Sequence, residues 1–355
     1  MGFYLSPGVY TREIDLSDII PNVATATAAL VGAPKKGDTT VPKLITTLDQ
    51  LFKEYGYPVV GNYFHYSAIG YLMHGNQLWC MRVINGALYG GAEIKEDGSS
   101  LDNIAFATGE ADPTAHSFGT DSVLVVYAKD PGVWDNSIKV TIEDVDAVAH
   151  TFTITVSYTD SKNVTTEVEV FEGCSRQAVL DGFGVQRFVE DRVNNYSQYI
   201  RVKNRTTVAD TVDPKEQITN LAFAGGTDGT AVTDGLVNTG LDKFSNPDEI
   251  DINIIINGGY TTPAVQNKII TICGARKDCF GLLDAPLTSE TAAEAITYRV
   301  STLNANTSYA GLFTHWVKMY DQWNDREVLV PNSGFVAGQF AFNDFVRDPW
   351  YSPAP

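Results

Sequence analysis

The sequence predicts a multi-domain α+β protein, in which an α/β core with a mixed or parallel sheet carries an inserted antiparallel β-sandwich or barrel. Strand and helix patterns alternate in residues 23–89 and again in 216–355, which is typical of a parallel sheet with crossover helices. Residues 90–215 instead show short segments with a two-residue period between turn residues. The 355 residues are ample for roughly two or three domains.

Residues 1–22 are predicted to be an extended N-terminal arm. Pro7-Gly8 and Pro21-Asn22 are turn or extended-chain signals, and the apolar residues between them show no sustained helical period. Residues 6–14 alternate like a strand, yet nothing nearby in the sequence can pair with them. We expect this arm to be disordered or loosely docked until it adds to the sheet of another chain.

The first half of the core begins with a strand of small residues, 26–31, suited to close packing. An amphipathic helix follows, because four apolar residues recur with the helical period. Thr46 or Thr47 is a plausible N-cap for it, and Gly56 marks its end. The four apolar residues are Leu48, Leu51, Phe52 and Tyr55. A second helix is predicted over 62–74, and residues 78–84 read as a strand that helices cover on both faces.

The inserted domain is predicted from strict alternation. In residues 151–158 an apolar residue occupies every second position, and residues 138–142 repeat the rhythm. Residues 123–127 and 164–171 are further strand candidates, and one helix is expected over 176–180. Short strands separated by Gly, Pro, Asp and Asn turns favour an antiparallel sandwich or barrel.

The second half of the core returns to strand and helix. Residues 250–256 read as a buried strand, and Pro263 can occupy the first turn of the next helix. A strand over 280–283 and a helix over 289–301 continue the pattern, and residues 317–330 read as a hairpin. We expect the two halves that flank the insertion to share one sheet.

The charge is uneven along the chain, whose net charge is -18. Residues 1–90 are neutral, residues 91–215 carry -10 and residues 216–355 carry -8. This balance argues against a nucleic-acid surface, which needs clustered Lys and Arg. It favours a solvated, outward-facing inserted domain. The sequence shows no apolar run long enough to span a membrane and no signal peptide at its start.

The cysteines and histidines predict neither disulfides nor a zinc site. Four scattered cysteines are too few for a disulfide framework and are expected to be buried free thiols. They are Cys80, Cys174, Cys273 and Cys279. The five histidines have no spacing that would hold zinc.

A glycine-rich block is the strongest candidate for chemistry in the middle of the chain. Gly225, Gly226, Thr227, Asp228 and Gly229 could approach a phosphate with backbone N–H groups. The block lacks the Lys and Ser or Thr of a P-loop and the spacing of a dinucleotide site. A tight turn where the chain re-enters the core is favoured, because glycine can adopt positive φ.

Other chemical readings are weaker. Two acidic clusters, 143–146 and 248–251, do not fit a calcium loop and are read as solvated turns. Ser333 does not match a hydrolase nucleophile motif, even with His315 as a possible base. A cluster of three aromatic residues is read as core or as a subunit contact, because few basic residues flank it. It consists of Trp316, Tyr320 and Trp323.

Short blocks spread in order along the chain resemble those of contractile tail sheath proteins, from bacteriophages and phage-like injection systems. Each block is weak alone, but their number and order make the resemblance specific. They are Ser6-Pro7-Gly8-Val9-Tyr10 followed by Thr11 and Glu13, Val31-Gly32-Ala33-Pro34, the glycine-rich block at 225–229, Ser308-Tyr309-Ala310, and residues 316–321, 330–338 and 350–355.

The resemblance implies a structural subunit and not an enzyme. It implies that the chain polymerises with itself as stacked hexameric rings around a tail tube, and that contraction drives the tube through the host envelope. The implied partners are the tail tube, baseplate and tail terminator proteins, with no cofactor, no nucleic acid and no membrane insertion. The implied location is the phage tail of the virion, after assembly in the host cytoplasm.

The resemblance also implies roles for two segments and exposes one departure. The segment from Ser6 to Glu13 would be an intersubunit arm, and Gly225–Gly229 would be the domain-junction turn. Sheath proteins continue past the Trp-x-x-Pro-Ala block into a further domain, whereas this sequence ends at Pro355. We therefore expect the C-terminal sheath domain to be absent. Because strand exchange needs both arms, we also expect this chain to be monomeric.

An alternative function is a surface or secreted protein that binds glycans with its acidic β-domain. The lack of a signal peptide disfavours secretion. Assembly of the complete protein into sleeves would distinguish the two functions, because a glycan-binding module would not form them.

Overall fold

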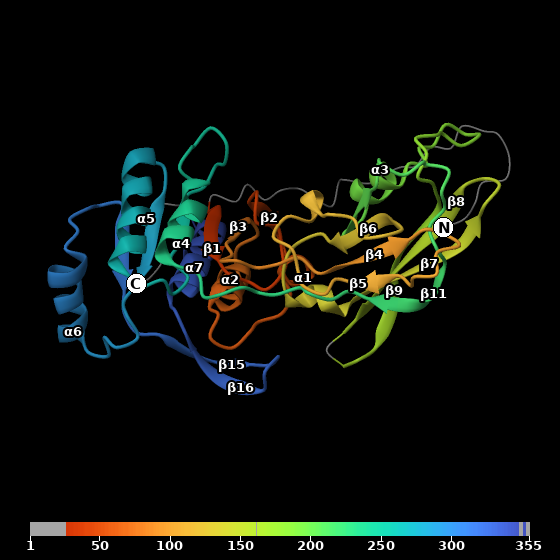
Figure 1. Ribbon diagram of the computed structural model, residues 1–355. Helices are drawn as coiled ribbons and strands as arrows, with labels where there is room; N and C mark the ends of the chain where they lie inside the picture. Colours follow the sequence, from red (N-terminus) through yellow and green to blue (C-terminus); the bar gives the residue numbers. More distant parts are fainter. Residues whose placement is uncertain (1–25, 161, 348–350, 353–355) are drawn as a thin grey trace.

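The molecule is elongated and has two parts, which lie side by side in Figure 1. The computed structural model describes residues 26–160, 162–347 and 351–352. We call the region around a six-stranded sheet the α/β part, and the region around two four-stranded sheets the β part. The predicted arm, residues 1–22, lies outside the described residues.

The six-stranded sheet joins both flanking halves of the chain, as predicted. Its order is β14 (Ala310–Phe313), β13 (Phe280–Asp284), β12 (Ile254–Ile256), β1 (Ala28–Gly32), β3 (Leu78–Arg82) and β2 (Lys43–Ile45). Neighbours pair in parallel except β2 and β3. Ala28 of the central strand lies opposite Ile254 on one side and Leu78 on the other. The sheet is therefore formed by segments that are far apart in the sequence.

Helices cover both faces of this sheet and bury β1 completely. The first face packs against α1 (Leu48–Tyr55), α2 (Phe64–Leu72) and α7 (Ser333–Val346). The second packs against α4 (Asp234–Asp242), α5 (Pro263–Arg276) and a π-helix (Tyr298–Leu303). Successive residues of β1 contribute to opposite cores, which explains why this strand and β3 lack alternation.

Local sequence signals set the ends of the first helix. Thr47 is the N-cap of α1, and its side chain accepts a hydrogen bond from the Gln50 N–H at 3.2 Å. Gly56 follows with φ of 78° and donates its N–H to the Phe52 carbonyl at 3.0 Å. The predicted cap and stop are confirmed at both ends.

Several elements of the second half differ from the sequence expectation. The strand predicted over 250–256 is reduced to β12, and α4, β14 and α7 were not predicted. The helix predicted over 289–301 is divided into α6 (Ala292–Thr297) and the π-helix. The expected hairpin is present as β15 (Val317–Asp321) and β16 (Arg326–Val330). These differences arise where packing, rather than local pattern, decides the conformation.

The β part contains two four-stranded antiparallel sheets. One has the order β10 (Ile200–Asn204), β6 (Ser122–Ala128), β4 (Gly91–Lys95) and β5 (Ile104–Ala105). The other has the order β11 (Gln217–Ala222), β7 (Ile138–Asp146), β8 (Thr151–Thr159) and β9 (Thr165–Cys174). A single buried cluster draws on both sheets, including Val126 of β6 and Val156 of β8.

The helix expected over 176–180 is wrong. The backbone there is held by pairing, since the Ser175 N–H donates to the Arg187 carbonyl at 2.7 Å. Arg176 is buried and donates to the carbonyls of Ala209 and Val212 at 3.0 and 2.7 Å. The Arg187 N–H also donates to the Val179 carbonyl at 2.9 Å, so the backbone of the segment pairs with residues near 187 in place of helical hydrogen bonds. The helix of this region is α3 (Val189–Asn194) instead.

The expected boundary at residue 215 also needs adjustment. Residues 217–222 form β11, which pairs with β7 in the β part. They therefore belong with the residues before 215 and not with the α/β part. Among the helices of the described residues, none is long and apolar enough to cross a membrane.

Candidate functional site

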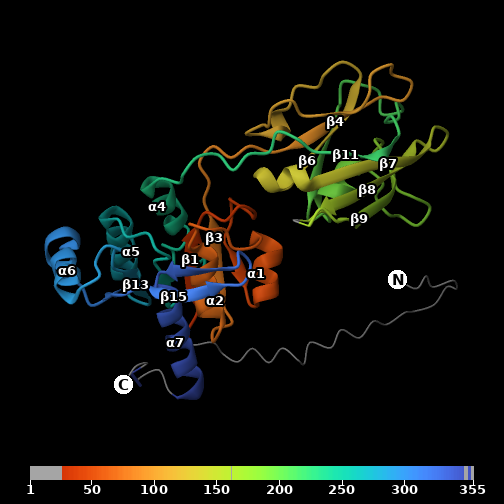
Figure 2. The same cartoon turned by 90° about the horizontal axis from the view of Figure 1, so that it is seen from below.

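Two linkers connect the α/β part to the β part, and they run beside each other in both views (Figures 1 and 2). The first follows β3 and the second follows β11. Their backbones pair, since Leu88 and Thr227 exchange two hydrogen bonds of 3.0 and 3.1 Å. The Thr230 N–H donates to the Asn85 carbonyl at 2.8 Å. We call this region, with the loops packed on it, the junction.

The structure places the glycine-rich block on the second linker. Gly225 and Gly229 have φ of 89° and 73°, a region that favours glycine. A Cβ atom on Gly226 would lie 2.4 Å from the Gly132 carbonyl oxygen. Thr227 pairs with the first linker, and Asp228 accepts the Val133 N–H at 2.9 Å. Positive φ at Gly225 and Gly229 and the close approach of the Gly132 carbonyl to Gly226 require glycine in this block. The carboxylate of Asp228 is engaged in a hydrogen bond with the backbone of Val133.

Arg82 lies at the end of β3 and is almost fully buried at the junction. Its guanidinium donates to the carbonyls of Pro34, Lys35 and Gly37, each at 2.9 Å. A fourth bond, of 2.7 Å, reaches the carbonyl of Pro131 in the β part. A buried charge with four carbonyl acceptors is well satisfied, and it ties backbone from both parts to one side chain.

Asp135 is fully buried beside the glycine-rich block. It belongs to a 3-10 helix, Val133–Ser137, and its Oδ2 accepts the Gly90 N–H at 2.9 Å. Its Oδ1 has no hydrogen-bond partner in the described part of the chain. Burial raises the pKa of Asp135 to about 8, although the Gly90 N–H and the Arg82 charge favour the ionised form. This carboxyl is therefore mostly protonated at neutral pH.

Lys36 extends from the loop after β1 towards aromatic rings of the β part. Its Nζ lies 4.7 Å from the centre of the Trp134 ring and 5.1 Å from that of Tyr199. It also donates to the Lys53 carbonyl at 3.0 Å. Burial lowers the pKa of Lys36, and the Asp130 carboxylate opposes this effect. The cation thus contacts both parts.

A second buried carboxyl lies at the carboxyl end of the parallel strands. In sheets of this type the crevice outside the strand ends is the usual ligand site. Here Asp284 accepts the N–H and the hydroxyl of Ser333, both at 2.7 Å. It also accepts the Asn257 side chain and the Gly259 N–H, both at 3.2 Å. The carboxylate caps the start of α7, so residues of the chain itself occupy this edge.

The weaker chemical candidates do not assemble into a site. Ser333 donates to Asp284, and the His315 ring contacts the Thr314 hydroxyl at 3.0 Å. Across the described residues, no group of three or more His, Cys, Asp or Glu side chains could hold a metal ion. All four cysteines are buried free thiols, as predicted. Trp316 and Trp323 pack against Tyr63 and Phe52, whereas Tyr320 is exposed.

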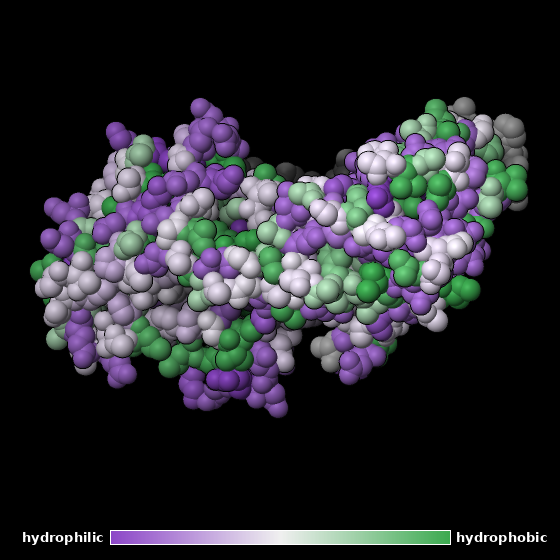
Figure 3. Space-filling model, viewed as in Figure 1, coloured by the Kyte–Doolittle hydropathy of each residue, from purple (hydrophilic) through white to green (hydrophobic). Residues whose placement is uncertain are grey.

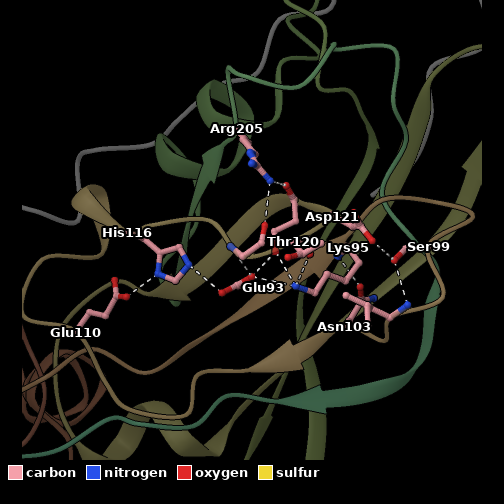
Figure 4. A network of polar contacts seen from close by, with 12 residues as sticks. Glu93, Lys95, Ser99, Asn103, Glu110, His116, Thr120, Asp121 and Arg205 are labelled. Carbon is pink, nitrogen blue, oxygen red and sulfur yellow. Dashed lines mark hydrogen bonds and ion pairs between the residues drawn. The ribbon is translucent and has the colours of Figure 1, made fainter.

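Figure 4 shows a polar network in the β part that sequence reasoning missed. Glu93 of β4 accepts from Lys95 at 3.2 Å and contacts the Nε2 atom of His116 at 3.1 Å. The other ring nitrogen of His116 contacts Glu110. Arg205 donates to the carbonyls of Gly119 and Ser122 at 3.0 and 2.9 Å. The network fastens the long segment between β5 and β6 to the sheet and leaves no free nucleophile.

A surface hollow lies between the β15–β16 hairpin and the segment before α2. It has a volume of about 460 Å³ and is lined in part by Val60, Leu287 and Leu329. On the face shown in Figure 3, apolar side chains gather beside this hairpin. Tyr320 and Leu329 are 59% and 47% exposed, so the hairpin presents apolar area to solvent.

Comparison with known sequences finds two phage proteins that match part of the chain. The chain is 30% identical over 157 residues to the tail sheath protein of Vibrio phage KVP40. It is 28% identical, also over 157 residues, to the tail sheath protein of Enterobacteria phage T4. The matched part of this chain is similar to phage tail sheath proteins.

The sheath relatives are much longer than the matched region. The match covers 37% and 38% of this chain, but only 23% and 24% of the two relatives. No protein-family model matches the sequence. A solved sheath tail protein from Listeria innocua has a similar fold, with a TM-score of 0.52 and 15% identity. That comparison covers 89% of this chain and 56% of the other.

Sequence reasoning missed the side chains that hold the junction together. Arg82 was read only as part of a buried strand, and Lys36 and Asp135 were not singled out. A charge inside an apolar strand could have indicated Arg82, because buried charges are paired or hydrogen-bonded. Nothing in the local pattern indicates that Lys36 contacts rings of the β part or that Asp135 is buried at the junction.

Proposed function

We propose that the chain functions as part of a contractile tail sheath subunit. The observation that carries this proposal is the sequence match to two phage tail sheath proteins. The complete subunit polymerises as stacked hexameric rings around the tail tube, and its contraction drives the tube through the host envelope. Its partners are its own copies, the tail tube protein, and the baseplate and tail terminator proteins. It is assembled in the host cytoplasm and resides in the virion tail.

We further propose a discontinuous core with one inserted, outward-facing domain. Separate buried clusters support it, two on the faces of the six-stranded sheet and one inside the β part. The pairing of β11 with β7 supports an insertion that ends near residue 222. Two open sheets around one core favour a sandwich over a closed barrel. The paired linkers with Gly225–Gly229 are the domain junction.

The segment from Ser6 to Glu13 is proposed as the intersubunit arm. Its support is the alternation of its sequence, since residues 1–25 lie outside the described residues. A strand exchanged between subunits keeps its backbone hydrogen bonds while the subunits rotate, because the bonds move with it. Apolar area at the β15–β16 hairpin offers a second place for contact between subunits.

Electron microscopy of the complete gene product tests the sheath function. Co-expressed with its tail tube protein, the complete gene product should form sleeves around tubes, and an arm variant that introduces charged side chains (Val9→Glu, Thr11→Lys) should not. A product that stayed dispersed, and bound glycans on an array, would support the glycan-binding alternative instead. A product that did neither would contradict both functions.

A further inference from the structure

The two parts of the molecule are joined by more than their linkers. The linkers form a narrow two-stranded connection, and such a connection alone allows one part to swing against the other. A third segment, the loop of residues 33–38 after β1, also crosses from the α/β part to the β part. We call it the crossing loop.

The crossing loop is held on its own side by the Arg82 guanidinium. Three of the four hydrogen bonds of Arg82 go to carbonyls of this loop, and the fourth goes to Pro131. The planar guanidinium fixes all these acceptors at once. The backbone of the crossing loop is therefore positioned against the turn of the β part that contains Pro131.

Two lysines of the crossing loop then contact the β part and the second linker. Lys36 places its Nζ over the rings of Trp134 and Tyr199, both of the β part. Lys35 pairs with Asp228 at 3.1 Å, and the same carboxylate accepts the Val133 N–H. The contacts converge on residues 131–134, on Tyr199 and on Asp228, so they oppose rotation about the linkers.

We propose that the crossing loop is a lock that fixes the orientation of the β part relative to the α/β part, with Lys36 as its central contact. The Lys36 cation is attracted to the faces of the two rings, whereas an uncharged side chain could occupy the same space without that attraction. This inference stands on the single chain and does not depend on the sheath function. If that function also holds, the lock determines where the outer domain points on the sleeve.

Spin labels on each part test the lock directly. Asn267→Cys on α5 and Thr166→Cys on β9 are exposed positions for labelling, and the four native cysteines are buried. Electron–electron double resonance should give a narrow distance distribution for the parent chain. Lys36→Met keeps the aliphatic stem but removes the charge, and should widen the distribution on the order of twofold.

Matched variants distinguish loss of the lock from loss of the folded structure. Trp134→Leu removes the aromatic ring of the β part that the Lys36 cation contacts, and should widen the distance distribution in the same way. Lys36→Arg preserves the cation and should keep it narrow, as should Lys139→Met on β7. Unchanged widths in both Lys36→Met and Trp134→Leu would overturn the proposal. So would loss of the folded near-ultraviolet circular dichroism in Lys36→Met, because Lys36 would then be part of a core.

Discussion

At the junction, the packing explains why single positions hold a buried ionisable side chain or a glycine. The carboxyl group of Asp135 is fully buried. The buried guanidinium of Arg82 is stabilised by hydrogen bonds that it donates to four carbonyls. Gly226 leaves room where two backbone segments meet. Each residue can be tested by a substitution that changes one property.

Asp135→Asn should stabilise the protein at alkaline pH and have little effect in acid. Because the pKa of Asp135 is raised in the folded state, the group contributes stability that is fully present below pH of about 4. That stability is lost as the pH rises through about 8. Asparagine keeps an oxygen acceptor for the Gly90 N–H and carries no charge. The melting temperature of the variant should exceed that of the parent by a few degrees, roughly, at pH 8.

Thermal melts between pH 5 and pH 8 check this expectation. Asp144→Asn is the control, because that aspartate is exposed. A difference between Asp135→Asn and the parent that stayed constant with pH would show that Asp135 does not titrate in this range.

Gly226→Ala should destabilise the fold by about 1–3 kcal/mol. The added Cβ would lie 2.4 Å from the Gly132 carbonyl oxygen and 2.8 Å from the Cβ of Asp135, so backbone must shift. Gly274→Ala is a matched control, because nothing lies within 4 Å of its Cβ position in α5. It should stabilise the helix by about 0.5–1 kcal/mol. Urea unfolding measures both values, and an equal effect of the two changes would contradict the close approach at Gly226.

At the scale of elements, strands and helices differ in how much they depend on distant contacts. α1 carries its own cap and stop, whereas α7 begins where Asp284 accepts hydrogen bonds from Ser333. The proposed arm is the extreme case, because its sequence alternates but offers no local partner. Ordering an arm costs roughly 1–2 kcal/mol per residue in backbone entropy, so only an intersubunit sheet with buried side chains can offset that cost.

Deleting residues 1–20 from the complete gene product should therefore separate assembly from folding. We expect the melting temperature of the core to stay nearly unchanged, while sleeves no longer form. Differential scanning calorimetry and electron microscopy give the two readouts. A strongly lowered melting temperature would make the arm part of the folded core, and normal sleeves would make it dispensable.

The whole molecule is organised by the insertion of one part between two segments of the other. Each of its buried clusters draws on residues of one part only, and the linkers carry the sole covalent connections between the described parts. The β part should therefore survive when the linkers are cut, because its sheets pair entirely within residues 91–222.

Limited proteolysis should release a stable fragment that begins near Gly90. Its end should lie beyond Ala222 and not near Asp213, because β11 pairs with β7 and its loss would expose a strand edge. Mass spectrometry of the resistant fragment gives both ends. Simultaneous degradation of the entire chain would show that the two parts unfold as one unit.

The sequence by itself determined the elements whose cause is local, and it indicated a resemblance to sheath proteins. Period and caps identify α1, the buried strand β3, the alternating β7 and β8, and the β15–β16 hairpin. The ordered blocks resemble those of sheath proteins, and the two relatives that match part of the chain are phage tail sheath proteins. The glycine block at 225–229 was predicted to be a tight turn; Gly225 and Gly229 have positive φ, and the segment pairs with the first linker.

Only the tertiary structure decided the elements and contacts whose cause lies far away in the sequence. The segment at 176–180 is not helical because its backbone pairs with residues near 187, and the buried Arg176 bonds to carbonyls more than 30 residues later. β11 joins the β part because β7 pairs with it, and the junction is held by Arg82 and Lys36, which contact residues of the other part. Local periodicity reports which side of an element is buried, but it carries no information about which distant group covers that side.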